Sequence, residues 1–424
     1  MRRRAVLAMA STATGGAALL AIAWLATRRL TTAELGYFFS FLSFGAFVQL
    51  SDFGLSFAAL QTAGRMVGTG SLDEIPGLAK KVASWGIAAS LISTIVVTIV
   101  GWVTFSRHSG DSSSVVAWAH PWLGYVAAVF FNQLTLPRMS LREGAGEVGQ
   151  MWRLRLAREW TGGAVCLLLL QRGAGLWSLC GYAATRALCA AAGLVLRPRL
   201  AAPADAPPYP LARWMADVWP FQWKIGVSGL AGFFIFQAFS PILLLEKGAV
   251  AAGEFGLAVA IMNLMIAVTT AYPMSHAAPY AAMHAEARHE ELRRDFPSML
   301  WRSTALAALA AVIAAAGLWK ARQMGIVVAL RLPDLVTTSL ILATAVVHHF
   351  VACYAVFLRT EGREPLLVPS VVGSAVTAIA IWAAAHSGTL RDVALVNLVC
   401  AFGGVPVVLL LMRNRVKHYS IQTG

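Results

Sequence analysis

Residues 36–60 read GYFFSFLSFGAFVQLSDFGLSFAAL, an almost wholly apolar stretch interrupted by one carboxylate, Asp52. A helix that crosses a bilayer needs about 20 consecutive, mainly apolar residues, so this stretch alone predicts a membrane span. Backbone polar groups cannot stay unpaired in lipid, which favours a helix over an isolated strand. By the same criterion the whole chain holds about twelve spans. Their predicted ranges are 5–27, 36–60, 81–104, 117–137, 157–171, 174–196, 219–245, 250–273, 299–318, 335–358, 365–386 and 392–412.

The composition of the chain is that of a membrane protein. Of 424 residues, 58% are hydrophobic and 13% are charged, and the mean hydropathy is +0.67. A soluble domain averages about 25% charged residues, so a string of soluble domains is excluded. The sequence therefore predicts an all-α polytopic membrane protein, in which the fifth run, 157–171, is short and has the least secure boundaries.

The N-terminal MRRR and the apolar run behind it have two interpretations, a cleaved secretory signal or the first membrane helix. The run extends over about 22 residues and ends in WLATRR without a small-residue cleavage site, which favours a helix. A cytoplasmic N-terminus places most of the 34 Lys and Arg residues on the inner side, as the positive-inside rule requires. Both termini are then cytoplasmic, and the expected location is a bacterial inner (plasma) membrane.

The net charge of +14 follows from this topology and from contact with anionic lipid headgroups, so nucleic acid is not an expected partner. The five cysteines all lie in apolar runs without the spacing of metal ligands. They are interpreted as small packing residues, and neither a disulfide framework, a metal site nor a cofactor is predicted.

The longest polar interruption, 197–217, is rich in proline and cannot be helical throughout. It divides the chain into an N-terminal lobe at 1–199, a cytoplasmic linker at 200–218 and a C-terminal lobe at 219–424. With about six spans in each half, both halves enter the membrane from the same side. This predicts two lobes related by a parallel pseudo-twofold axis, with a central cavity between them.

A short repeat supports two related halves. TTAELGYFFSF at 31–41 aligns without a gap to AAGEFGLAVAI at 251–261, which pairs Glu34 with Glu254 and Gly36 with Gly256. Both segments are predicted at the outer face, between the first and second helices of a half. The glycine predicts a tight turn, and the glutamate favours the N-terminus of the following helix.

The stretch TTAELGYFFSFLSFGAFVQLSDFGLSFAALQTAGR at 31–65 contains Glu34-x-Gly36, the DFGL turn at 52–55 and Arg65. Together with TTAYPMSHAAPYAAMHAEARHEELRR at 269–294, it resembles the polysaccharide (O-antigen type, Wzx-like) flippases. These belong to the multidrug/oligosaccharidyl-lipid/polysaccharide exporter superfamily. The number of spans and the midpoint linker extend the resemblance over the whole chain.

The resemblance implies a flippase that moves an undecaprenyl-pyrophosphate-linked oligosaccharide, an O-antigen or exopolysaccharide repeat unit, to the periplasmic leaflet. Its partners would be this lipid-linked oligosaccharide and membrane lipids, with a polysaccharide polymerase and a chain-length regulator as further candidates. A multidrug or cation antiporter of the same fold is the alternative, a polytopic polysaccharide polymerase or ligase is a less favoured one, and a structural scaffold is the weakest. A polymerase or ligase is disfavoured, because the outer segments 105–116 and 319–334 are short and no catalytic constellation appears.

A cavity for a sugar pyrophosphate needs cations for the phosphates and amides for the sugars. An ionisable residue at the bilayer centre costs about 3 kcal/mol, so each one there is a candidate. Arg186, close to the middle of the sixth run, either lines the cavity or packs between helices. Lys224 is a cavity-mouth residue or an interfacial anchor, and a mid-span amide makes substrate contacts or helix–helix hydrogen bonds. The remaining cavity candidates are Arg65, Asn132, Gln237 and Asn263.

Asp52 leaves three interpretations open. It caps a broken or tilted helix, it bonds to a basic residue such as Arg65 or Arg186, or it couples transport to protons or sodium through a raised pKa. The remaining gate candidates are either closing contacts of an outer gate or simple anchors, namely Arg28, Arg29, Glu246 and Lys247.

Overall fold

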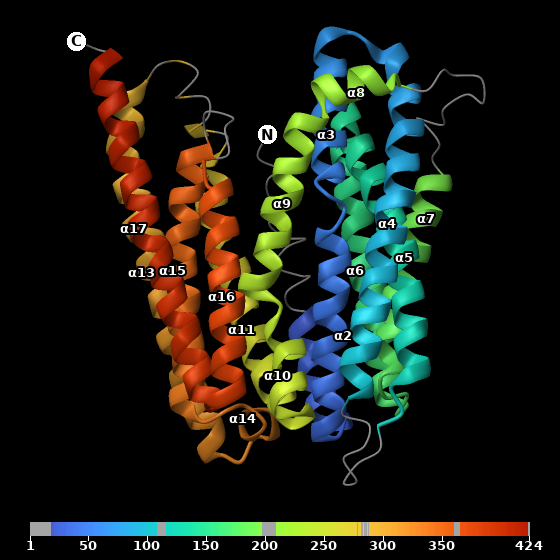
Figure 1. Ribbon diagram of the computed structural model, residues 1–424, viewed down its shortest axis with the longest axis vertical. Coiled ribbons are helices and arrows are strands. Elements are labelled where there is room, and N and C mark those ends of the chain that lie inside the picture. Colours follow the sequence, from blue (N-terminus) through green and yellow to red (C-terminus); the bar gives the residue numbers. More distant parts are fainter. Residues whose placement is uncertain are drawn as a thin grey trace. The chain divides into compact units, whose positions relative to one another are not determined.

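The computed structural model describes residues 18–107, 116–196, 209–277, 279–280, 283, 286, 288–359 and 365–422, the last nine of them by their backbone alone. The described chain is helical throughout and separates into two compact units (Figure 1). Unit 1 comprises the described residues up to Phe233 together with Leu243–Gly253, and unit 2 comprises Phe234–Ile242 and the residues from Glu254 onward. These units follow packing, so the lobes predicted from the proline-rich interruption, 1–199 and 219–424, stay a prediction.

The helices of unit 1 are residues 18–29, α2 (Thr32–Leu50), α3 (Leu55–Thr69), α4 (Ile75–Ser106), α5 (Ala119–Arg142), α6 (Val148–Gln171), α7 (Trp177–Val195) and α8 (Leu211–Asp217). A 3-10 turn, η1 (Leu72–Glu74), precedes α4, and a π-helical turn, η2 (Glu143–Glu147), joins α5 to α6. The units share α9 (Trp219–Phe236), α10 (Phe239–Lys247) and α11 (Ala249–Ser275). Unit 2 continues with α13 (His289–Gln323), α14 (Val327–Leu330), α15 (Leu335–Leu358), α16 (Leu367–Ser387) and α17 (Leu390–Gln422).

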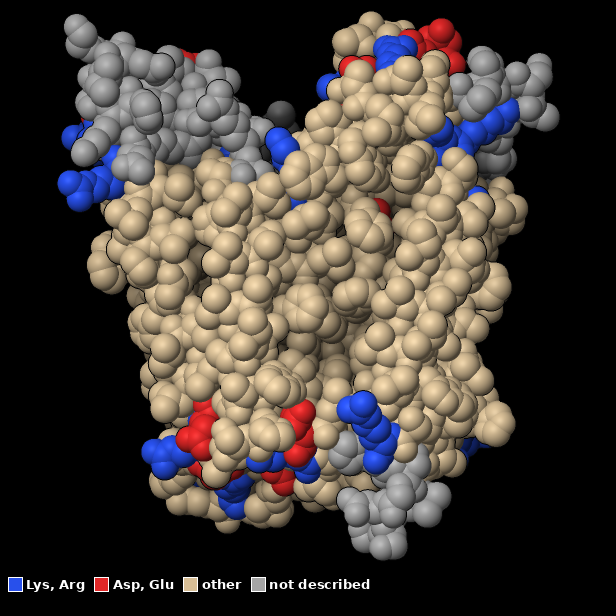
Figure 2. All heavy atoms as spheres, in the orientation of Figure 1, with Lys and Arg blue, Asp and Glu red and all other residues tan. Residues whose placement is uncertain are grey.

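Length and hydropathy allow eight helices of the described chain to cross a membrane, or nine if α9 and α10, bent by 46°, form one span. The predicted class, an all-α polytopic membrane protein, is confirmed. Two further long helices, α5 and α6, carry charged side chains and fail this criterion, and most of the first predicted run lies outside the described residues. On the visible face, charged side chains gather toward the ends of the helices and leave an apolar band between them (Figure 2).

The fifth helix is longer than the sequence predicts. This helix, α6, begins at Val148 instead of residue 157, because the basic residues at 153 and 155 are part of the helix and not of a loop. Gly146, with φ 99°, breaks the helical path inside η2 and separates α5 from α6. A backbone with φ in this range favours glycine, which explains where the chain turns.

Aromatic side chains form much of the packing between α2, α4 and α5. The Trp122 ring lies 4.9 Å from Phe41 and 5.0 Å from Phe105, measured between centroids, and Phe41 stacks on Tyr125 at 5.8 Å. Lipid tails are as apolar as these rings, so close packing rather than removal from water stabilises the contact. Gly45 and Gly101 make room for it, because a Cβ at either position would collide with an aromatic side chain.

The second predicted span, 36–60, is broken between Leu50 and Leu55. Asp52 stabilises the break, since its Oδ1 accepts from the Gly54 amide at 2.8 Å and its Oδ2 from the Ser56 amide at 2.9 Å. Gly54 (φ 75°) and Phe53 (φ 50°) both adopt positive φ. The predicted capping role of Asp52 agrees with these contacts. The predicted bond to Arg65 or Arg186 is wrong, because backbone amides occupy both carboxylate oxygens and the ion pairs of the described residues do not include Asp52.

The first copy of the repeat packs against the start of the second copy, at Gly253, within unit 1. Glu34 completes a capping box with Thr31 at the start of α2, as expected of an acidic residue there. The predicted tight turn is wrong, because Gly36 and Gly256 both lie inside helices. Gly36 instead lets α2 approach the backbone of Ala249, and a Cβ on Gly253 would lie 2.9 Å from the Gly36 nitrogen. Glu254 lies inside α11 rather than at its start.

The C-terminal part of the predicted linker forms α8, which lies across one end of α3 and α4 (Figure 1). Trp214 of α8 is fully buried in a cluster with Leu78, and its ring stacks on Trp85 at 6.4 Å between centroids. Arg213 pairs with Glu74 at 2.7 Å. This part of the linker is therefore fixed to unit 1, while residues 200–208 lie outside the described residues.

Candidate functional site

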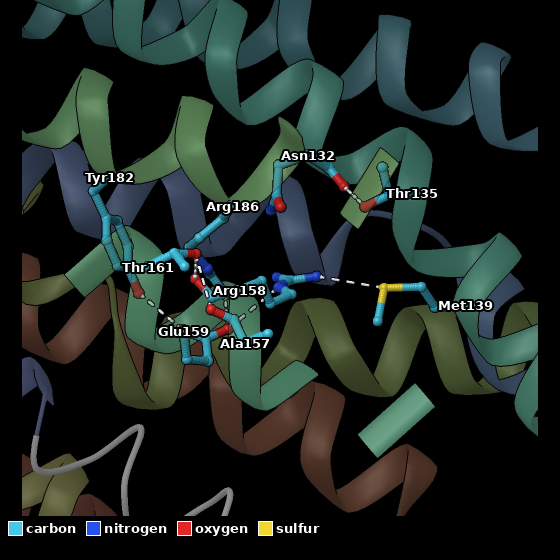
Figure 3. A network of polar contacts seen from close by, with 9 residues as sticks. All are labelled: Asn132, Thr135, Met139, Ala157, Arg158, Glu159, Thr161, Tyr182 and Arg186. Carbon is cyan, nitrogen blue, oxygen red and sulfur yellow. Dashed lines mark hydrogen bonds and ion pairs between the residues drawn. The ribbon is translucent and has the colours of Figure 1, made fainter. Parts of the chain in front are cut away.

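The middle of α7 carries an arginine that is paired inside unit 1. The Arg186 Nη2 donates to Glu159 Oε1 of α6 at 2.5 Å, and its guanidinium lies 4.9 Å from the centre of the Tyr182 ring, one turn earlier on α7 (Figure 3). Tyr182 also donates its hydroxyl to Glu159 Oε2 at 3.2 Å. Both oxygens of Glu159 are therefore engaged by α7.

A second arginine shares the same carboxylate. The Arg158 Nε lies 3.4 Å from Glu159 Oε1, the oxygen that Arg186 already holds. The Arg158 side chain is only 4% exposed, and its Nη1 makes a weak contact with the sulfur of Met139 at 3.8 Å. Two guanidinium groups and one carboxylate leave the network, defined as Arg158, Glu159, Tyr182 and Arg186, with one excess positive charge.

Close contact between α6 and α7 positions this network. Gly162 of α6 faces Arg186, and a Cβ there would lie 2.6 Å from the Arg186 Cγ and 3.1 Å from the Tyr182 carbonyl oxygen. A glycine at this position therefore allows the helices to approach and fixes the stem of Arg186. Helix geometry does the rest, because Tyr182 and Arg186 are four residues apart and so lie on one face of α7.

The side chain of Asn132, on α5, lies nearby (Figure 3). Asn132 and Gln133 are each 1% exposed, and the Asn132 Oδ1 and both polar atoms of the Gln133 amide find no partner. Figure 3 shows the Asn132 amide directed toward the side of α5 on which the arginines lie. Buried polar groups without partners are costly, and in native structures such groups commonly mark a place for a water molecule or a ligand.

The arrangement is suited to holding an oxygen anion. Guanidinium groups present fixed donors to phosphate and carboxylate, and amides can contact the remaining oxygens. A metal is not suggested by the described residues, which contain no group of three His, Cys, Asp or Glu side chains able to hold one.

The other predicted cavity residues lie elsewhere. Arg65 is an exposed residue of α3 that donates to Thr62 at 3.4 Å, and Lys224 is an exposed residue of α9. Gln237 and Asn263, both half-buried, belong to unit 2 and are described apart from the network. The structure therefore brings together Arg186 and the region of Asn132 only; the roles of all these residues stay predictions.

The predicted gate residues are also placed. Arg28 and Arg29 are exposed, and the Arg28 guanidinium lies 4.3 Å from the centre of the Trp24 ring. Glu246 is half-buried and Lys247 is exposed at the end of α10. Their part in a gate stays a prediction.

Sequence reasoning missed Arg158, Glu159 and Tyr182. Arg158 stands at the edge of the predicted fifth run, 157–171, next to the basic residues 153 and 155, and nothing in the sequence separates it from them. One signal was available, since Glu159 is followed at once by the apolar, glycine-containing segment WTGGAVCLLLL at 160–170. A carboxylate at the edge of a span predicts a cationic partner, and Arg186 in the next predicted run is such a cation.

No family model and no curated protein matches the chain. Solved structures do match over nearly its whole length. One is described as an inward-facing conformation of a multidrug resistance MATE family transporter of the MOP superfamily; it is 13% identical, with a TM-score of 0.75, and the match covers 99% of this chain and 100% of the other. An outward-facing conformation of such a transporter is 14% identical, with a TM-score of 0.61, and covers 98% and 96%.

A third structure is a MOP superfamily transporter from Pyrococcus furiosus, described as having a binding pocket of reverse polarity that suggests a different function. It is 14% identical, with a TM-score of 0.62, and the match covers 98% of this chain and 96% of the other. At these identities the likeness shows the fold. The chain therefore has the fold of MOP superfamily transporters.

Proposed function

We propose that the protein is a flippase that moves an undecaprenyl-pyrophosphate-linked oligosaccharide from the cytoplasmic to the periplasmic leaflet by alternating access. Two observations support transport rather than catalysis as its general activity. The chain has the fold of MOP superfamily transporters, and proteins of this fold are described in both inward-facing and outward-facing conformations. The lipid-linked substrate comes from the sequence resemblance.

The observation that carries the substrate class is the excess of guanidinium over carboxylate in the network of α6 and α7. A buried cation without a full partner is costly, so its presence in a membrane-spanning bundle favours a ligand of opposite charge. A pyrophosphate diester supplies such a charge. In the described chain two charged side chains are buried, and both are arginines, Arg142 and Arg158.

An antiporter of organic cations is the second candidate, because transporters of this fold include multidrug resistance proteins. Such a protein needs acidic side chains that are free to meet a cation. In unit 1, Asp52 holds two backbone amides and Glu159 holds Arg186 and Tyr182. The fold itself accommodates both polarities, as the description of the Pyrococcus furiosus transporter indicates.

We also propose the membrane in which the protein acts, its orientation and its partners. We expect a bacterial inner membrane with both termini in the cytoplasm, and contacts with membrane lipids. A polysaccharide polymerase and a chain-length regulator are the proposed protein partners, since a translocated repeat unit has to be joined to others.

Transfer in proteoliposomes tests the function. The purified protein is reconstituted with a fluorescent undecaprenyl-pyrophosphate oligosaccharide, and a membrane-impermeant quencher reports which leaflet holds the label. Arg186→Ala should slow transfer about ten- to a hundredfold, the loss expected for a charge-assisted hydrogen bond, and Arg186→Lys should retain part of the activity.

Arg172→Ala, which removes an exposed arginine just after α6, should transfer like the wild type. If the wild type moves no lipid-linked oligosaccharide but exchanges organic cations for protons or sodium, the flippase assignment is wrong and the antiporter is correct.

A further inference from the structure

Glu159 occupies the position that an external anion would take. Its two oxygens lie where the oxygens of a phosphate would lie, one against Arg186 and Arg158 and the other against the Tyr182 hydroxyl. This carboxylate therefore stands in for a bound anion in the structure.

The partners of Glu159 are fixed, whereas Glu159 itself is the more accessible group. The Arg186 side chain is 11% exposed and Arg158 is 4% exposed, while the Glu159 side chain is 25% exposed. The stem of Arg186 packs directly on α6 at Gly162, where an added Cβ would lie 2.6 Å from the Arg186 Cγ. The carboxylate can therefore leave by side-chain rotation, and the guanidinium groups would stay in position to receive a replacement.

The charge balance also favours replacement. With Glu159 in place the network carries one excess positive charge, because two guanidinium groups pair with the same oxygen of a single carboxylate. A phosphate or pyrophosphate carries more charge and more acceptor oxygens than one carboxylate, so it can satisfy donors that Glu159 leaves open. One of these is the Arg186 Nε, which has no hydrogen-bond partner, and the Arg158 Nε has only the 3.4 Å ion-pair contact with Glu159 and no hydrogen bond.

We propose that Glu159 is a tethered competitor that occupies an oxyanion site formed by Arg158 and Arg186, and that a phosphate-type anion binds there by displacing it. This inference rests on the proposed function only for the source of the anion. The anion is either the pyrophosphate of a lipid-linked substrate or free inorganic phosphate or pyrophosphate, and the chemistry of recognition is the same.

Such a competitor sets affinity and release in opposite directions. A tethered carboxylate weakens binding of the anion, because it must be displaced, and speeds release, because it returns to the arginines as the anion leaves. Glu159 is thus a positioning and specificity residue rather than a group that contacts the substrate during transfer.

Binding of inorganic pyrophosphate to the purified full-length protein in nanodiscs tests the site, with calorimetry as the readout. Glu159→Gln should lower the Kd about ten- to a hundredfold, because the competing charge-assisted hydrogen bonds of Glu159 are removed. Glu159→Asp keeps the charge on a shorter side chain and should give an intermediate Kd. The double variant Glu159→Gln/Arg186→Gln should lose the gain.

Glu143→Gln is the matched control. Glu143 is 13% exposed and pairs with Arg155 of α6 at 2.8 Å, so its removal breaks another ion pair of the same helix without freeing Arg186. Its Kd for pyrophosphate should equal that of the wild type. Thermal unfolding of each variant shows whether it is folded. If folded Glu159→Gln binds pyrophosphate no better than the wild type, or if Glu143→Gln gains as much, Glu159 is only a structural ion-pair partner and the inference fails.

A second arm separates the sources and the two proposals. Undecaprenyl pyrophosphate, undecaprenol and inorganic pyrophosphate are compared on Glu159→Gln. A gain for both pyrophosphates and none for undecaprenol confirms an oxyanion site. If Glu159→Gln binds inorganic pyrophosphate more tightly but the wild type transfers no lipid-linked oligosaccharide, this inference holds and the flippase assignment is wrong. If the wild type transfers the oligosaccharide but Glu159→Gln binds pyrophosphate no more tightly, the flippase assignment holds and this inference is wrong.

Discussion

Outward transfer should respond to membrane potential without any carboxylate taking up a proton. The pyrophosphate diester of the proposed substrate carries about two negative charges, and one charge crossing 100 mV is worth about 2.3 kcal/mol. With the interior negative, export gains about 4.6 kcal/mol at that potential, which shifts the distribution between leaflets on the order of a thousandfold. The gain scales with the part of the field that the headgroup crosses.

A potential-driven step agrees with the contacts of three carboxylates in the unit 1 helices, which are already engaged. Asp52 accepts from two backbone amides, Glu34 closes a capping box, and Glu159 holds Arg186 and Tyr182. A coupling carboxylate has to exchange a proton or a sodium ion with water. These three would first have to give up hydrogen bonds that stabilise the helices.

The assay uses proteoliposomes that carry the fluorescent lipid-linked substrate, with equal pH and equal sodium on both sides. A potassium gradient and valinomycin set the potential, and the rate of transfer should rise with it. Asp52→Asn should lower stability or rate, since it weakens the cap of α3, yet leave the dependence on potential intact. The reasoning is refuted if transfer ignores the potential, follows a proton or sodium gradient, and loses that response in Asp52→Asn.

Three further predictions follow from the fold. Gly162→Val should separate α6 from α7 and cost about 1–3 kcal/mol by overpacking, measured by thermal unfolding in detergent, whereas Gly163→Ala meets only the Ala18 Cβ at 3.4 Å and should be neutral. Asp334 caps α15; burial alone would raise its pKa, but hydrogen bonds from Thr337 and the Val336 amide outweigh this and hold the pKa below its ordinary value. Asp334→Ala should therefore lower the free energy of unfolding by about 0.5–2 kcal/mol at neutral pH. The ionised carboxylate stabilises the fold above the unfolded pKa of about 4, and this stabilisation is lost as the pH falls through the lower folded pKa, so the difference from wild type should shrink below about pH 4 and then vanish. A difference that persists in acid contradicts the capping account. Reporter fusions after residues 70, 145, 207 and 290 should read cytoplasmic and those after 32, 248 and 326 periplasmic, and a periplasmic signal after 207 would disprove the division into two halves.

The fold class could be predicted from the sequence because a membrane-spanning helix needs a long run of apolar residues, which is visible in the sequence. Runs of apolar residues fix which segments are helices, and the resulting class is confirmed by the helices and by the match to MOP superfamily transporters. The break at Asp52 was also foreseen as one of several interpretations, since a carboxylate followed by Phe53 and Gly54 fits a cap. What apolar runs cannot indicate is how far a helix continues through charged residues, and the predicted run is shorter than α6 for this reason.

The site could be predicted only in part. Arg186 stands out because it is a lone cation in an apolar run, but its partners lie on another helix and enter the network through packing. Arg158 and Glu159 lie at the edge of the predicted fifth run beside a basic stretch, and only the close approach of α6 and α7 at Gly162 places them next to Arg186. The contact between Gly36 and Gly253 could not be predicted for the same reason, because a glycine in a sequence indicates a turn as readily as a close crossing of two helices.

The shared carboxylate of α6 and α7 also bears on how the chain enters the membrane during synthesis. An arginine at the centre of a helix costs about 2.5–3.5 kcal/mol on the scale measured for translocon insertion, and α6 and α7 each carry one. The segment between them, 172–176, is short, so Glu159 and Arg186 belong to one hairpin. Insertion of the two helices as a pair places their charges against each other before either has to face lipid alone. The translocon is therefore expected to release α6 and α7 together, and the ribosome has to finish α7 before α6 can settle in the bilayer.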